Sequence, residues 1–181
     1  DLDNIGTMPP SAEFLVFYRD NLEAAMRRET ELFFRHVLDH NQPPREFLDA
    51  DYSFLNRELA LHYGINGVEG NALKRVSLKG TGRGGLIGQG AFLTASANGV
   101  DTSPVVRGIY VLEKLLGYTP PPPPPDVPTI EPDIRGAVTI RGQLEKHREI
   151  ATCAECHRKI DPLGFALENF DAIGGWRTEY G

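Results

Sequence analysis

Two cysteines and a histidine stand together near the end of this chain, in the order Cys153-Ala154-Glu155-Cys156-His157. Cysteines three positions apart lie on one face of a helical turn, so their sulfurs can form thioether bonds to the two vinyl groups on one edge of a porphyrin. The adjacent imidazole then points at the iron. This order and spacing is the attachment motif of c-type haem. It predicts a covalently bound haem c, attached through Cys153 and Cys156, with His157 as the proximal iron ligand.

Three other interpretations explain less of this pattern. A dithiol redox site also uses two cysteines at this spacing, but it is typical of a βαβ pattern that the chain lacks, and it does not require the histidine. A structural zinc site needs four ligands, and two cysteines with an adjacent histidine cannot all reach one tetrahedral ion without strain. A fortuitous buried pair explains neither the spacing nor the histidine. We therefore favour haem over zinc and over a dithiol.

The second axial ligand of the iron is less clearly marked. Only 24 residues follow His157 and none is Met or His, so the downstream methionine loop of small soluble cytochromes c is missing. We take His147, in the helix expected before the motif, as the tentative distal ligand. His62 and Met26 are further candidates within the chain. The remaining alternatives are a residue from another chain and an open distal site.

Two more residues are predicted to support the haem. Pro162 follows the motif, and its backbone carbonyl would accept a hydrogen bond from the imidazole Nδ1–H; alternatively, Asp161-Pro162 only starts a helix. Arg107 has a bidentate donor fork that suits a haem propionate, or it lies solvated on its helix. Three aromatic side chains would form the apolar wall that keeps water from the ring: Phe165, Phe170 and Trp176.

The elements that must position these residues are mostly helices. Apolar residues at helical spacing predict helices over residues 21–40 and 51–63, which we expect to pack together. A third helix is predicted over residues 105–116, because Ser103-Pro104 supplies a cap and a first-turn proline, and Gly117 closes it.

The rest of the chain has fewer regular elements. Nine of the 19 glycines lie between Gly64 and Gly90, which predicts irregular, closely approaching backbone, with room for a short helix over residues 86–97. Residues 139–149 are expected to form a helix leading into the cysteines, and Asp161-Pro162 to start another. We find no alternating strand pattern of useful length.

Six consecutive prolines, residues 120–125, divide the chain. Such a run forms an extended polyproline II rod, which acts as a spacer or as a strap over a surface. We expect a helical N-terminal region with a Gly-rich loop over residues 1–118, the polyproline linker or strap over 119–135, and the haem-attachment segment over 136–181. The predicted fold class is mostly α, a helical cytochrome c-like haem module with an N-terminal helical extension and a polyproline strap.

The charge balance excludes some functions. The chain carries 19 Lys and Arg residues against 25 Asp and Glu, a formal net charge of −6. It therefore lacks the basic footprint of nucleic-acid binding and a basic face for anionic lipid. The longest early apolar stretch, residues 14–18, is far too short to span a bilayer, so we expect no transmembrane segment. The chain opens on Asp1-Leu2-Asp3, without Met or a secretory segment, and we expect a mature form or a trimmed piece.

Several motifs together resemble a known family. Residues 144–148 (LEKHR), the cysteine motif and residues 160–171 (IDPLGFALENFD) are similar to the C-terminal haem module of planctomycete-type multidomain c-type cytochromes, whose modules carry domain-of-unknown-function labels. Further upstream, the chain resembles the same proteins at residues 49–56, 62–65, 84–86 and 102–108 and in the proline run. The resemblance implies an exported haem protein, usually part of a much longer polypeptide. It implies no known reaction.

Together these features predict a monohaem c-type cytochrome that carries single electrons through its covalent haem, as an electron carrier rather than an enzyme. The expected location is periplasmic or otherwise extracytoplasmic in a bacterium. The expected partners are redox proteins or other subunits of a larger electron-transfer assembly, and the acidity of the chain favours a partner with a basic docking face. The alternative is a haem enzyme or a gas- or peroxide-binding sensor with an open distal site. A third interpretation is an interaction module in which the haem is a staple or relay.

Overall fold

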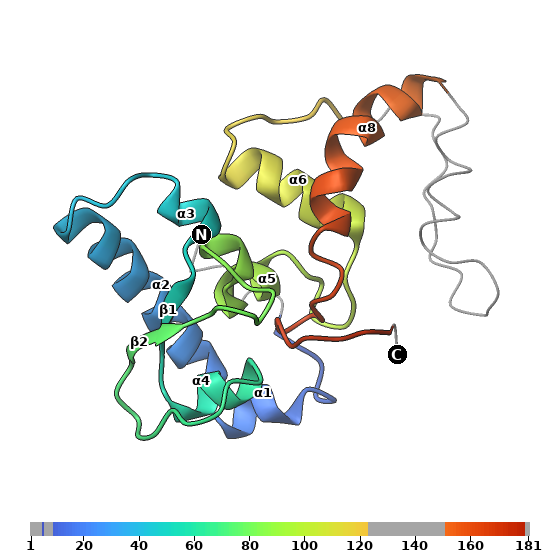
Figure 1. Cartoon of the computed structure of the whole chain (residues 1–181). Coiled ribbons are helices and arrows are strands. Elements are labelled where there is room, and N and C mark those ends of the chain that lie inside the picture. Colours follow the sequence, from blue (N-terminus) through green and yellow to red (C-terminus); the bar gives the residue numbers. More distant parts are fainter. Residues whose placement is uncertain (1–4, 6–8, 123–150, 180–181) are drawn as a thin grey trace. The chain divides into compact units, whose positions relative to one another are not determined.

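The computed structural model describes residue 5, residues 9–122 and residues 151–179 (Figure 1). The predicted helix over residues 139–149, the tentative ligand His147 and part of the proline run lie outside these residues. The chain divides into two compact units, Asp1–Ser103 with Glu168–Gly181, and Pro104–Leu167. Among the described residues, no helix is both long and apolar enough to cross a membrane.

The first unit is built around one long helix. Helix α2 (Leu22–Asp39) confirms the helix predicted over residues 21–40, and its buried face carries apolar side chains at helical spacing. Short helices surround it: α1 (Leu15–Arg19), α3 (Glu46–Asp49), α4 (Arg57–His62), the 3₁₀ helix η2 (Leu86–Gly88) and α5 (Gly90–Ala95). Leu22 and Met26 of α2 share one apolar core with Leu59 and Ala60 of α4, so the expected packing of these two segments is confirmed.

A small sheet replaces the first half of a predicted helix. Strand β1 (Tyr52–Leu55) pairs antiparallel with β2 (Lys74–Ser77), with Tyr52 opposite Ser77. The helix predicted over residues 51–63 is therefore wrong up to Asn56, whose side chain caps α4 by accepting a hydrogen bond from the Leu59 N–H at 3.0 Å. Strand β1 shows no alternation because both its faces are covered, and even the polar Ser53 is fully buried.

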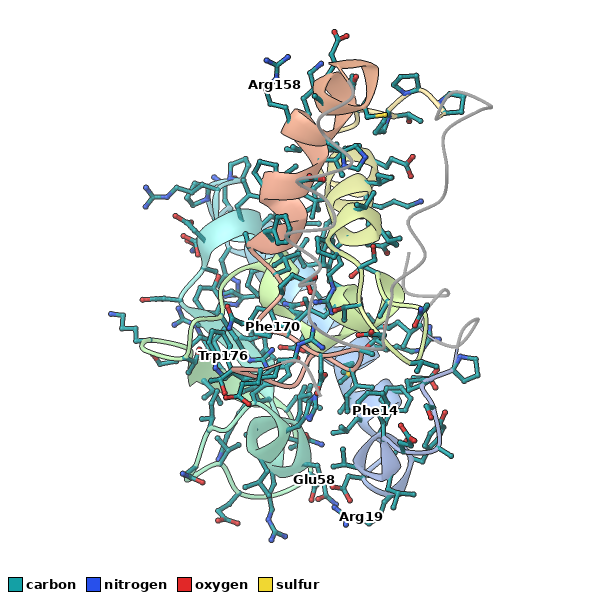
Figure 2. The ribbon with its side chains drawn as sticks, turned by 90° about the vertical axis from the view of Figure 1, so that its right-hand side faces the viewer. Phe14, Arg19, Glu58, Arg158, Phe170 and Trp176 are labelled. Carbon is teal, nitrogen blue, oxygen red and sulfur yellow. The ribbon has the colours of Figure 1, made fainter. Side chains whose placement is uncertain are left out.

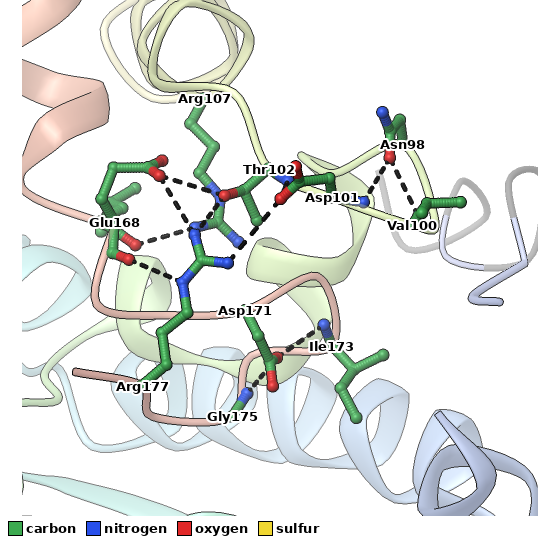
Figure 3. Close-up of polar contacts among 11 residues, drawn as sticks. Asn98, Val100, Asp101, Thr102, Arg107, Glu168, Asp171, Ile173, Gly175 and Arg177 are labelled. Carbon is green, nitrogen blue, oxygen red and sulfur yellow. Dashed lines mark hydrogen bonds and ion pairs between the residues drawn. The ribbon is translucent and has the colours of Figure 1, made fainter. Parts of the chain in front are cut away.

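The C-terminal segment completes the first unit. Arg177 fastens it, because its guanidinium donates to Thr102 Oγ1 at 2.5 Å and to Glu168 Oε2 at 3.2 Å (Figure 3). Asp171 then closes a tight loop by accepting hydrogen bonds from the backbone N–H groups of Ile173 and Gly175. Ile173 is buried in the same core as α2 and α4, so the chain end belongs structurally to the first unit.

In the described part of the second unit, helices α6 (Pro104–Lys114) and α8 (Ala151–Phe165) pack closely together (Figure 1). Glycines make the close approach possible. A Cβ added at Gly108 would overlap the backbone carbonyl of Ile160, and one added at Gly164 would overlap that of Pro104. Helix α6 confirms the helix predicted over residues 105–116, and helices outweigh strands among the described residues, which is compatible with the mostly α fold class.

The start of a new helix at Asp161-Pro162 is a wrong prediction. Pro162 lies inside α8, which runs without a break to Phe165. Proline removes one backbone donor from a helix and usually ends or kinks it. Here the flanking turns, at Ile160 and Gly164, are held directly against α6, and this packing outweighs the lost hydrogen bond.

Candidate functional site

All three residues of the cysteine motif lie on the N-terminal half of α8. Both cysteines are free thiols; Cys153 is buried and Cys156 is half-buried. The helix brings side chains three positions apart onto one side, which is the spacing that two thioether bonds to one porphyrin edge would need. The two thiols therefore have the required spacing on one helix, with Cys153 in the interior and Cys156 nearer the surface.

His157 is held by a carboxylate one helical turn further on. Its Nδ1 lies 2.8 Å from Oδ1 of Asp161, and the side chains of His157 and Asp161 are 14% and 1% exposed. A carboxylate can only accept a hydrogen bond, so Nδ1 carries the proton and donates it. The other ring nitrogen, Nε2, is then the unprotonated one that can bind iron.

Asp161 takes the role that was expected of Pro162. In a continuous helix each carbonyl points toward the C-terminus, and that of Pro162 accepts a hydrogen bond from the Ala166 N–H at 3.2 Å. It therefore points away from His157, which precedes it. Sequence reasoning misses the contact between Asp161 and His157, because Asp161-Pro162 resembles a helix start. The available signal was the four-residue spacing from His157 within one helix.

Arg107 is not solvated on its helix. It is fully buried on α6, and its Nη1 donates to the backbone carbonyl of Leu167 at 2.8 Å. This bond ties the chain just beyond the end of α8 to α6. The structure thus gives Arg107 a part in joining the two helices that support the motif, while binding of a propionate stays a prediction.

A cavity of about 220 Å³ borders the thiol of Cys156. One wall is α8 itself, and the other is formed by the first prolines of the proline run with Tyr118, whose ring lies 5.2 Å from Lys159 Nζ. Pockets for drug-sized ligands span about 300–1,000 Å³, so this cavity is smaller than a typical site for a drug-sized ligand. Its lining residues are Tyr118, Pro120, Pro121, Glu155, Cys156, Lys159 and Ile160.

The sequence matches two known protein families. Residues 83–180, more than half of the chain, match PSCyt3, a protein of unknown function (DUF1588). The chain belongs to the PSCyt3 family. Residues 1–65 match PSD4, also a protein of unknown function (DUF1592). Both families are typical of planctomycete-type multidomain c-type cytochromes. No curated protein and no solved structure matches the chain significantly.

The two distal-ligand candidates that the structure describes are both occupied by other contacts in the first unit. His62 Nε2 donates to the backbone carbonyl of Ile173 at 2.8 Å, and burial lowers the pKa of this imidazole. Met26 is fully buried in the apolar core, where its sulfur lies 3.9 Å from the hydroxyl of Thr94. Met26 is therefore an ordinary core residue in this arrangement, and His62 joins α4 to the PSCyt3 region.

The three aromatic residues proposed as a wall are divided between the two units. Phe165 belongs to α8, whereas Phe170 and Trp176 pack edge to face in the first unit, with ring centroids 5.2 Å apart (Figure 2). Arg83 lies over Phe170, 4.7 Å from its centroid. In the parts of the chain that the structure describes, no three His, Cys, Asp or Glu side chains are grouped so as to hold a metal ion.

Proposed function

We propose that this chain carries single electrons through a haem c attached to Cys153 and Cys156, with Nε2 of His157 as the proximal ligand. The observation that carries the proposal is the arrangement of these residues on α8: two cysteines one turn apart, beside an imidazole whose Nδ1 lies 2.8 Å from a buried carboxylate. These features fit a haem c. The match to two families typical of c-type cytochromes supports the same assignment.

When bound, the haem supplies a one-electron couple at its iron. The residues of the chain do the rest. Cys153 and Cys156 would hold the porphyrin edge covalently, and Asp161 keeps the proton on Nδ1 so that Nε2 would be the nitrogen that binds iron. Close backbone contact between α6 and α8 holds this helix rigidly, which limits reorganisation when the charge changes.

The finer parts of the proposal concern the surroundings of the haem. Residues 136–181 carry one haem, residues 119–135 act as the strap, and residues 1–118 form the helical extension. His147 would supply the distal ligand, and Arg107 would reach a propionate. Covalent attachment favours a periplasmic or other extracytoplasmic location, where a dissociable cofactor would be lost. Redox proteins or subunits of a larger assembly are the partners, with a basic docking face matching the net charge of −6.

Covalent attachment is tested by exporting the full chain to the periplasm of a bacterium that matures c-type cytochromes. We expect the intact mass to exceed the sequence mass by one haem, and the denatured band to stain for haem. The double variant Cys153→Ala, Cys156→Ala should lose both. An unmodified mass, or covalent haem that persists in the double variant, would contradict the proposal.

A second candidate is a haem enzyme or gas sensor with an open distal site. It is favoured by the contacts that already engage Met26 and His62. The visible spectrum separates the two candidates. A sharp low-spin reduced spectrum unchanged by carbon monoxide supports electron transfer. High-spin ferric bands and rapid carbon monoxide binding would support the open site instead.

A further inference from the structure

Asp161 is a buried carboxylate with a specific partner, and we propose that it tunes the haem. Its side chain is 1% exposed and lies 2.8 Å from Nδ1 of His157. We infer that Asp161 is a positioning residue that makes His157 a more electron-rich iron ligand and thereby lowers the reduction potential of the haem. This inference rests on the proposed function of the same site.

The position of Asp161 is fixed by the fold on both sides. Because α8 continues through Pro162, Asp161 lies one full turn after His157 on the same side of the helix. The preceding residue, Ile160, contacts the backbone of α6 at Gly108, and the next turn does so through Gly164. The carboxylate therefore cannot move far from the imidazole without separating the two helices.

The chemical consequence follows from the acceptor. A metal-bound histidine is made more basic by the group that accepts its other N–H. An ionised carboxylate accepts a charge-assisted hydrogen bond, which is stronger than one to a neutral backbone carbonyl. Burial strengthens it further, because little water screens the interaction. A more basic ligand favours ferric iron over ferrous iron, so the reduction potential falls.

The other charged side chains that the structure describes on α8 differ from Asp161 in their exposure. Glu155, Arg158 and Lys159 are all exposed on α8, and Arg158 extends away from the helix (Figure 2). Exposed charges are screened by water and salt. An alternative role for Asp161 is a structural ion pair that only stabilises α8. Such a pair would affect unfolding but would leave the potential of the haem unchanged.

The experiment is a redox titration of the haem-loaded full chain and its variants. Asp161→Asn keeps the shape of the side chain but removes its charge, and we expect the equilibrium constant for reduction to rise at least tenfold, a positive shift of about 59 mV for one electron. Asp161→Glu restores a carboxylate and should recover part of the lower potential. Glu113→Gln, an exposed carboxylate on α6, is the matched control for charge alone and should change the constant by much less.

Electron paramagnetic resonance of the ferric haem supplies a second readout. A strongly hydrogen-bonded imidazole changes the spread of g values, and Asp161→Asn should move them toward those of a neutral imidazole. If that variant does not fold, the spectrum of the wild type still tests the inference. Neutral-imidazole g values in the wild type would overturn it. Equal potentials for Asp161→Asn and Glu113→Gln would overturn it as well. Absence of covalent haem in the wild type would instead remove the proposed function.

Discussion

The two units each bury one carboxylate completely, and they hold these groups differently. Among the described residues, Glu29 in the first unit and Asp161 in the second are the fully buried acids. Glu29 accepts hydrogen bonds at 2.6 Å from the hydroxyls of Ser53 and Tyr63, two neutral groups inside the core. Asp161 instead lies 2.8 Å from Nδ1 of an imidazole, that of His157. The comparison separates a carboxylate held by core hydroxyls from one that contacts a residue of the cysteine motif.

The cluster around Glu29 also joins the two family regions. Tyr63, at the end of the PSD4 match, accepts a hydrogen bond from the Gly90 N–H at 2.6 Å in the PSCyt3 match. Arg83 lies 3.8 Å above the ring of Tyr63 and donates to the backbone carbonyls of Gly88 and Gly174. The first unit is thus built from both matched regions, and the family boundaries do not coincide with the boundaries of the compact units.

We expect the largest loss of stability from removing the Glu29 side chain. Glu29→Ala leaves two buried hydroxyls without their acceptor and creates a cavity, so we expect the free energy of unfolding to fall by about 3–4 kcal/mol at pH 5. Chemical denaturation measures this change. Glu23→Ala removes an exposed acid from the same helix, paired only with Arg27, and should cost less than about 1 kcal/mol. Equal losses in the two variants would show that the buried cluster is not structural.

The second largest effect is a pH dependence of the free energy of unfolding that comes from Glu29. Burial raises the pKa of Glu29 from 4.5 to about 7. Between these values the folded chain retains a proton that the unfolded chain releases, so the free energy of unfolding falls as pH rises, by up to about 3 kcal/mol, and levels off above pH 7. The difference between wild type and Glu29→Gln across this window isolates the effect. A constant difference from pH 4 to 8 would contradict the assignment.

A smaller loss is expected from Tyr63→Phe. The hydroxyl donates to Glu29 and accepts from Gly90, and burial holds the pKa of Tyr63 well above its usual value, so it stays neutral in the folded chain. Its removal should lower the free energy of unfolding by about 1–3 kcal/mol. Tyr118→Phe, at a partly exposed ring, is the control and should be nearly neutral. If Tyr63→Phe left the free energy of unfolding unchanged, the hydroxyl of Tyr63 would not stabilise the contact between the two family regions.

The smallest effect on stability is expected from Asp161→Asn. The amide oxygen can still accept from His157, so the free energy of unfolding should fall by only about 1 kcal/mol, even though the haem potential shifts. Thermal and chemical denaturation of the haem-loaded chain measure the cost. A loss as large as that of Glu29→Ala would make Asp161 a structural carboxylate too, and the contrast between the two units would disappear.

Local patterns were good predictors where a helix buries one face. The apolar spacing predicted α2 and α6 to within a few residues. Apolar spacing gave a wrong prediction for residues 52–55, which form strand β1 instead of a helix. Their apolar side chains fit a helix or a strand equally well, and the choice was made by pairing with residues 74–77.

The chemistry of the candidate site was determined largely by the order of residues. Two thiols and an imidazole at fixed spacing need only one helical turn to face one porphyrin, so Cys153, Cys156 and His157 could be assigned without any long-range contact. Tertiary structure decided what supports them. Contact with α6 allows α8 to continue past Pro162. Only a continuous helix brings Asp161 to the Nδ1 of His157. Local sequence encodes which groups are neighbours along a helix, but whether the helix persists depends on packing against residues far away in the chain.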